Sequence, residues 1–146
     1  MHSIDALSER VRQHGGKLTA QRLLIWQALS GDETHPTAED LFARLRPQAP
    51  TLSLTTVYSV VNELVEWGEI RLFDAGDGRI HFDPNMAPHA ELICMRCHSV
   101  SDAPTAASHA VDQELELPRE IAGFRVVTRS EQYYGFCPAC QRELAG

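Results

Sequence analysis

The sequence predicts an α+β fold in two parts, with helices in the first half of the chain and short strands in the second. Apolar residues recur at helical spacing in the first half, whereas alternating apolar residues and two C-x-x-C pairs follow residue 90. Between them, residues 84–90 contain two prolines and no periodicity. We therefore expect one domain over residues 1–84, a hinge over 85–90 and a second domain over 91–146.

Each helix of the first half has a start or stop signal in the sequence. The expected N-caps are Thr19, Thr37 and Ser53, and the expected stops are Gly15 and Gly68. Apolar stripes lie between these signals at intervals of three and four residues. The pattern predicts four short helices before residue 69.

Two extended runs, Ile70–Phe73 and Arg79–Asp83, flank a turn-rich segment at 74–78 and predict a β-hairpin. Helices followed by a hairpin form the outline of a winged helix, in which a polar helix enters the DNA major groove and the hairpin lies against the backbone. The polar, uncharged face of the fourth helix consists of Thr55, Thr56, Tyr58, Ser59 and Asn62. The first domain is therefore expected to bind double-stranded DNA through this face.

All four cysteines of the chain fall in two pairs, Cys94-x-x-Cys97 and Cys137-x-x-Cys140. This spacing lets four thiolates close around one tetrahedral Zn²⁺. Four sulfur ligands leave no open coordination position, so we expect a structural zinc that ties the end of the chain to its middle. Two disulfides or a redox C-x-x-C are the alternatives, but disulfides are rare in reducing compartments.

The charge of the chain weighs against a nucleic-acid partner. There are 13 Lys and Arg against 20 Asp and Glu, a formal net charge of −7. DNA binding would have to depend on a few well-placed cations or on bound divalent metal. The chain shows no apolar leader and no run of the roughly 18–20 apolar residues that a membrane span requires, so we expect a cytoplasmic protein.

A second metal site is suggested by nitrogen and oxygen donors on both sides of the hinge. The candidates are His35, His81, His89, Glu91 and Asp102. A hinge could bring them together, and a metal between the halves would then fix the angle between them. On the residues alone, a lone histidine is more often a surface or hydrogen-bonded residue than a ligand.

Four motifs in order resemble the signatures of the ferric uptake regulator superfamily over nearly the whole chain. They are His35-Pro-Thr-Ala-Glu-Asp40, Leu54-Thr-Thr-Val-Tyr58, His89-Ala-Glu-Leu-Ile-Cys94-x-x-Cys97 and Tyr134-Gly-Phe-Cys137-x-x-Cys140. The resemblance implies a homodimeric, metal-responsive bacterial transcription regulator that represses genes of metal homeostasis or oxidative stress. It also implies a C-terminal α/β dimerisation domain that holds the four-cysteine zinc.

The same resemblance implies that His35, His81, His89, Glu91 and Asp102 bind the regulatory metal. Two of these positions depart from common members, because position 81 is often acidic or cysteine and position 91 is commonly His. Three imidazoles and two carboxylates without sulfur suit Mn²⁺ or Fe²⁺ and do not exclude Zn²⁺. The chain is therefore expected nearer the iron, manganese and peroxide sensors than the zinc sensors.

On the DNA side, Tyr58 matches a recognition-helix tyrosine of the family, and Lys17 and Arg22 match its basic segment. Ser59 stands where the family frequently has Arg, which removes one contact. A further family site in the dimerisation domain is expected to be absent, and His98 and His109 are expected to be surface residues.

Three other functions are alternatives to this one. A peroxide sensor, in which bound Fe²⁺ oxidises a neighbouring histidine, is a variant of the same interpretation. A zinc-ribbon adaptor that binds only protein would suit the acidic charge. A zinc hydrolase is disfavoured because the chain has neither an H-E-x-x-H nor a nucleophile motif, so we do not expect an enzyme.

Overall fold

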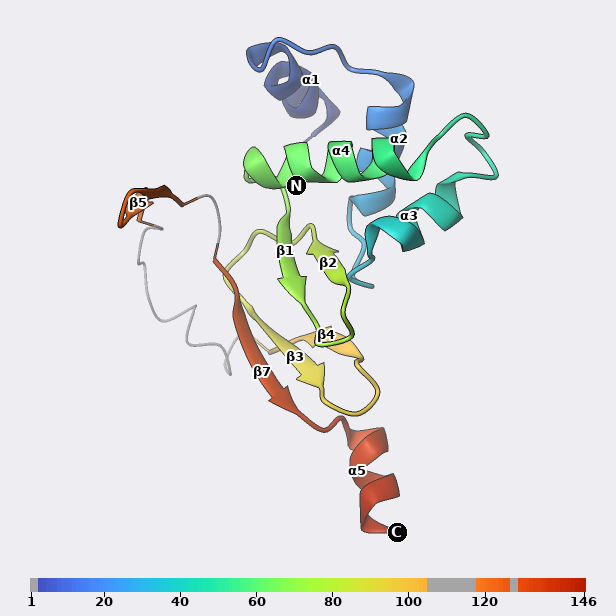
Figure 1. The fold of residues 1–146 in the computed structure, drawn as a ribbon, viewed down its shortest axis with the longest axis vertical. Helices are drawn as coiled ribbons and strands as arrows, with labels where there is room; N and C mark the ends of the chain where they lie inside the picture. Colours follow the sequence, from blue (N-terminus) through green and yellow to red (C-terminus); the bar gives the residue numbers. More distant parts are fainter. Residues whose placement is uncertain (1–2, 105–117, 127–128) are drawn as a thin grey trace.

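The computed structural model describes residues 3–104, 118–126 and 129–146 of the chain. Four helices form one end of the molecule, a β-hairpin leads from them to a small sheet, and a last helix lies at the far end (Figure 1). The helices are α1 (Ile4–Gln13), α2 (Ala20–Leu29), α3 (Ala38–Leu45), α4 (Leu54–Glu66) and α5 (Pro138–Ala145). The strands are β1 (Arg71–Asp74), β2 (Ile80–Asp83), β3 (Ala90–Cys94), β4 (Val100–Asp102), β5 (Glu120–Ile121), β6 (Phe124–Arg125) and β7 (Glu131–Gly135).

The four predicted helices are present, and each of the three expected N-caps accepts a hydrogen bond from a backbone N–H in the first turn of its helix. At α3 the cap is a full capping box, because the Asp40 carboxylate also accepts from the Thr37 N–H. Trp26, Ile25, Leu41 and Val61 are among the side chains that pack into one core between α1, α2, α3 and α4. This core fixes the position of the hairpin that follows.

The hairpin pairs β1 with β2 in antiparallel register, with Arg71 opposite Asp83. Gly76 and Gly78 take positive φ values in its turn, a conformation that glycine adopts without strain. The side chains of Asp74 and Asp77 each accept a backbone N–H two residues ahead, which closes the turn twice over. We call residues 75–79 the wing turn.

A three-stranded sheet follows the hinge, in the order β4-β3-β7. β3 is antiparallel to β4 and parallel to β7, with Ile93 opposite Tyr134. The short strands expected after residue 90 are thus present around the first cysteine pair and before the second. Phe124 lies on the short β6, which pairs with β5, and residues 105–117 lie outside the described part of the chain.

A small apolar cluster joins the two halves. Phe73 and Ala75 of the hairpin pack against Ile93 of β3, and Val100 of β4 covers their edge. One face of the sheet therefore rests on the wing. Among the described residues, none of the helices is both long and apolar enough to cross a bilayer.

Candidate metal centres and nucleic-acid interface

The four cysteines come together where β3 and β7 end. One sulfur from each of Cys94, Cys97, Cys137 and Cys140 lies within 4.8 Å of all the others, and none is in a disulfide. The Cys137 N–H donates to the Cys94 sulfur at 3.4 Å, and the Cys140 N–H to the Cys137 sulfur at 3.5 Å. Such bonds stabilise thiolates, so the group fits the structural Zn²⁺ that the spacing predicts.

The thiol pKa values show the same preference for a bound cation. Backbone N–H groups of Cys137 and Cys97 lower the pKa of Cys94 to about 6. Burial and the neighbouring sulfurs raise the pKa of Cys140 to about 12. Without metal, the four sulfurs cannot all ionise because their charges repel, and a dication removes that penalty.

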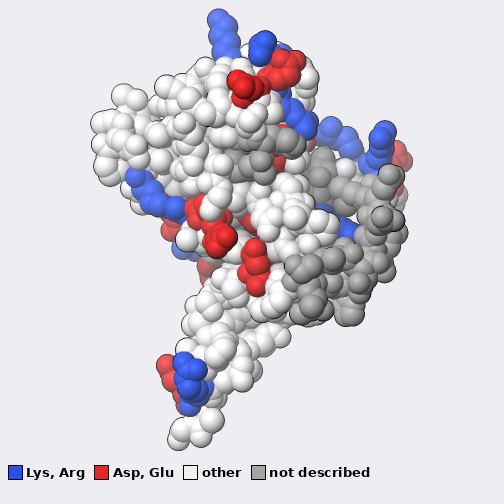
Figure 2. All heavy atoms as spheres, turned by 180° about the vertical axis from the view of Figure 1, so that it is seen from behind, with Lys and Arg blue, Asp and Glu red and all other residues white. Residues whose placement is uncertain are grey.

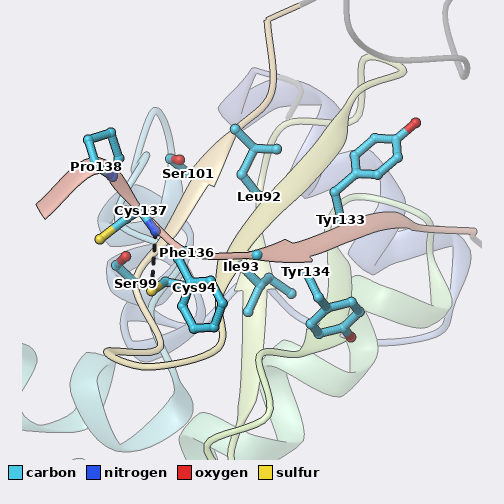
Figure 3. A pocket seen from close by; sticks show the side chains of 11 residues that line it. Leu92, Ile93, Cys94, Ser99, Ser101, Tyr133, Tyr134, Phe136, Cys137 and Pro138 are labelled. Carbon is cyan, nitrogen blue, oxygen red and sulfur yellow. Dashed lines mark hydrogen bonds between the residues drawn. The ribbon is translucent and has the colours of Figure 1, made fainter. Parts of the chain in front are cut away.

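Beside the cysteines, the outer face of the sheet is open and apolar (Figure 3). Leu92 and Tyr133 lie on one side of the strands there, and they are 40% and 38% exposed. Ile93 and Tyr134 point to the other side, where Ile93 is buried on the wing. A hollow of about 220 Å³ is lined by all four of these side chains and by Cys137.

A second group of donors lies at the junction of the two halves. One atom from each of His35, Asp83, His89 and Glu91 lies within 4.8 Å of the other three, and all four residues are buried. His35 Nε2 is 3.2 Å from Glu91 Oε2, and His89 Nε2 is 3.0 Å from both Glu91 Oε1 and Asp83 Oδ2. The half-exposed Asp102 adds a carboxylate oxygen 3.0 Å from His35 Nε2.

His81 does not join this group, although the sequence predicts it as a ligand. Asp83 lies in the group instead. The His81 ring hydrogen-bonds through Nδ1 to the His35 carbonyl oxygen and through Nε2 to Asp77, at 2.8 and 2.9 Å. Both nitrogens are thus occupied by oxygen acceptors. The donor set becomes two imidazoles and three carboxylates, instead of three and two.

Several atoms of the junction group are buried without a well-formed hydrogen bond. They are His35 Nδ1, His35 Nε2, Asp83 Oδ2 and Glu91 Oε2. Three of these four atoms lie in the ion pairs given above, but buried polar atoms almost always form a well-directed hydrogen bond, so their convergence without one fits a bound cation. Carboxylate and imidazole donors fit a hard or borderline divalent cation such as Mn²⁺ or Fe²⁺.

Arg71 is a buried cation beside these ligands that sequence reasoning missed. Its Nη2 donates to the carbonyl oxygens of Asn85 and Ala87 in the hinge, at 2.5 and 2.8 Å. The same nitrogen is 2.6 Å from His89 Nδ1 and 3.6 Å from Asp83 Oδ2. Arg71 therefore holds the hinge against the hairpin and offsets part of the carboxylate charge. Its cross-strand position opposite Asp83 was the available signal.

The electrostatics of the junction favour protons as well as metals. Burial alone would lower the pKa of His35, but Glu91 at its Nε2 and the charges of Asp83 and Asp102 raise it above its ordinary value. Burial and the nearby Glu91 charge raise the pKa of Asp83. A metal ion must displace these protons.

The predicted DNA face of α4 is largely exposed. Thr55, Tyr58, Ser59 and Asn62 are open to solvent, whereas the Thr56 hydroxyl lies 2.8 Å from the cap hydroxyl of Ser53. Tyr58 is 39% exposed and is not a core residue. Its hydroxyl donates to Glu39 Oε1 at 2.5 Å, which orients the ring from α3.

The two predicted cations differ in their availability. Lys17 is exposed, but Arg22 forms a bidentate ion pair with Glu63 at 2.8 and 3.1 Å. A third nitrogen of Arg22 donates to the Lys17 carbonyl oxygen. On the face in Figure 2, Lys and Arg side chains form separate small groups with Asp and Glu between them, and the described residues there make no continuous basic surface.

A winged helix joined at a metal-binding junction to a cysteine-clamped sheet defines a metal-responsive transcriptional regulator. Residues 13–131 match the ferric uptake regulator family, so the chain belongs to this family. It is 28% identical over 140 residues to the peroxide-responsive repressor PerR of Staphylococcus aureus (strain USA300), covering 96% of this chain and 93% of the relative.

Two solved structures share the fold. The Helicobacter pylori ferric uptake regulator, described as having three functional metal-binding sites, superposes with a TM-score of 0.72 at 17% identity, covering 94% of this chain and 91% of that one. The Pseudomonas aeruginosa ferric uptake regulator with manganese superposes with a TM-score of 0.67 at 25% identity, covering 89% and 96%. The arrangement of wing, hinge and sheet is thus a shared architecture.

Proposed function

We propose that a divalent metal bound by His35, Asp83, His89, Glu91 and Asp102 sets the orientation of the winged helix and thereby represses transcription. The observation that carries this is the position of the ligands. His35 and Asp83 precede the hinge, whereas His89 lies at its end and Glu91 and Asp102 follow it. Metal affinity therefore becomes a coupling energy for one arrangement of the two halves.

Mn²⁺ and Fe²⁺ are the favoured ions. Three carboxylates outnumber two imidazoles, and no sulfur takes part, which suits harder cations. Zn²⁺ can also bind such a set of ligands, because the order of affinities among divalent metals depends more on the metal than on the site. The controlled genes would be those of metal uptake or oxidative stress.

The open apolar face of the sheet supports a homodimer as the working form. Leu92 and Tyr133 on that face would be buried against a second copy, and two winged helices would then face one operator. Two DNA-binding domains in one dimer also lower the affinity that each domain must supply for DNA, which matters for a chain of net charge −7.

The test begins with genomic DNA fragments selected by the zinc-loaded protein in the presence of Mn²⁺. Affinity for a recovered fragment is then measured with and without Mn²⁺ or Fe²⁺ under reducing conditions. We expect metal to tighten binding by about 5- to 150-fold. Glu91→Gln and Asp83→Asn should lose this response, while Asp74→Asn, a change of the same kind outside the junction, should keep it.

Equal affinity in every case would remove the regulatory claim. Failure to select any DNA would instead favour the zinc-ribbon adaptor that binds protein alone. A peroxide response would appear as the mass of one oxygen atom added to a His35 or His89 peptide with Fe²⁺ and peroxide but not with Mn²⁺.

A further inference from the structure

His81 lies between the junction group and the wing turn and touches both. Its Nδ1 bonds to the carbonyl oxygen of His35 at 2.8 Å, and its Nε2 bonds to Oδ2 of Asp77 at 2.9 Å. The side chain is buried and its ring stacks on Phe73, with 5.7 Å between ring centroids. One rigid ring thus spans the distance from a metal ligand to the turn.

The backbone at His35 has little freedom to absorb movement. Its φ of 51° is in the left-handed region, which non-glycine residues enter only when their surroundings hold them there. Pro36 follows, and its carbonyl oxygen accepts the Phe82 N–H from β2. A displacement of the His35 ring should therefore also move the His35 carbonyl group, because the surrounding backbone cannot rotate to absorb it.

The wing turn has a second attachment to the same segment. Arg79 donates through Nη2 to the Thr37 hydroxyl at 2.6 Å and to Asp40 at 3.2 Å. Asp77 also accepts the Arg79 N–H, so the two attachments meet inside the turn. The orientation of the turn depends on residues 35–40 at both points.

We propose that His81 is a positioning residue that couples metal at His35 to the orientation of the wing turn. His35 would hold the cation, which would fix its ring and, through the constrained backbone, its carbonyl group. His81 fixes Asp77 relative to that carbonyl, and Asp77 sets the turn. This inference rests on the proposed function, because the readout is metal-dependent DNA binding. By linkage, DNA on the wing tightens metal binding by the same factor.

The test measures the coupling ratio, defined as the DNA dissociation constant without Mn²⁺ divided by the constant with saturating Mn²⁺. His81→Phe keeps a ring that can stack on Phe73 but removes both hydrogen bonds. Asp77→Ala removes the far end of the connection and leaves His81 in place. Asp74→Ala is the matched control, because it also removes one charge and one turn hydrogen bond but does not touch His81.

We expect His81→Phe and Asp77→Ala to reduce the coupling ratio by about 2- to 30-fold, with Asp74→Ala unchanged. Zinc content and one Mn²⁺ per chain should be retained in all three. A purely structural role would weaken DNA binding with and without Mn²⁺ alike and leave the ratio intact, which would overturn the inference.

If His81→Phe fails to fold, the pair Asp77→Ala and Asp74→Ala decides alone. Equal ratios in that pair, in a protein whose wild type responds to Mn²⁺, would overturn the role of His81 and leave the proposed function standing. No Mn²⁺ response in the wild type would overturn both.

Discussion

The two candidate metal-binding groups differ in the kind of donor they use and in where those donors lie in the chain. The cysteine group consists of donors of one kind in two local knuckles, and Cys97 is exposed to solvent. The junction group mixes imidazoles and carboxylates from both sides of the hinge, and in its buried core two carboxylate oxygens contact histidine nitrogens without a well-directed hydrogen bond. The first arrangement favours permanent occupancy, whereas the second stores a charge imbalance that a metal ion relieves. Permanence and responsiveness thus follow from where the donors lie as much as from what they are.

Removing a cysteine should have the largest effect of the changes considered. Cys137→Ser should abolish zinc binding and unfold the β4-β3-β7 sheet, because structural zinc contributes roughly 10–16 kcal/mol of apparent binding energy in small domains. Helices α1 to α4 should persist, since they have their own core. Metal analysis and circular dichroism measure both effects, and an intact sheet without zinc would contradict the structural role.

A milder change should separate the junction group from the cysteine group. Asp83→Asn should weaken Mn²⁺ binding by at least about 10- to 100-fold, the range seen even for residues behind the ligands. It should also raise the thermal stability of the metal-free protein, because it removes a buried charge next to Glu91. Titration calorimetry tests the loss of Mn²⁺ affinity, and thermal melts test the gain in stability of the metal-free protein. Asp74→Asn serves as the control.

A fall in pH should affect the junction group and leave the cysteine group unchanged. The raised pKa of His35 means that the folded metal-free protein still binds a proton there above pH 6.5, where the unfolded chain has released it. The raised pKa of Asp83 acts in the same direction above its ordinary value of 3.8. The stability that His35 contributes should therefore be lost as pH rises from 6.5 through the folded-state pKa and regained as pH falls, while Mn²⁺ affinity falls by up to about tenfold per pH unit for the proton displaced. Zinc content should not change over this range. Affinity independent of pH would argue against His35 as a ligand.

The smallest effect should come from a region outside both groups. Thr37→Ala removes the cap of α3 together with the hydroxyl that accepts from Arg79 of the wing turn, so it should cost at least about 1 kcal/mol of unfolding free energy in urea, with or without Mn²⁺. Ser53→Ala, which removes the cap of α4, gives the reference value. A loss at Thr37 that depends on Mn²⁺ would show that the α3 cap and the junction are one unit.

Local patterns in the sequence predicted much of the fold, and long-range pairing limited the rest. Caps at Thr19 and Thr37 and the two cysteine knuckles depend on residues within a few positions, so spacing alone reveals them. His81 and Asp83 lie two apart on one strand and both are buried. Only the position of the hinge, nearer to Asp83, shows which of them reaches the junction.

Charge partners far apart in the sequence were the other limit. Arg22 stays a predicted DNA contact, and no local pattern in the sequence indicates its ion pair with Glu63, 41 residues away. Arg71 lies opposite Asp83 in the hairpin, but its partners in the hinge come from 14 and 16 residues further along the chain. Composition does not distinguish these cations from free ones, because their role depends on how the helices and the hinge pack.

The parallel pairing of β3 with β7 brings Cys94 opposite Gly135, just before the second knuckle. A slip of one residue between these strands would turn every side chain of β7 to the other face and draw Cys137 away from the remaining sulfurs. The zinc can close only on the correct alignment. A zinc ion bound by all four sulfurs would therefore stabilise this register of β3 and β7 and no neighbouring one.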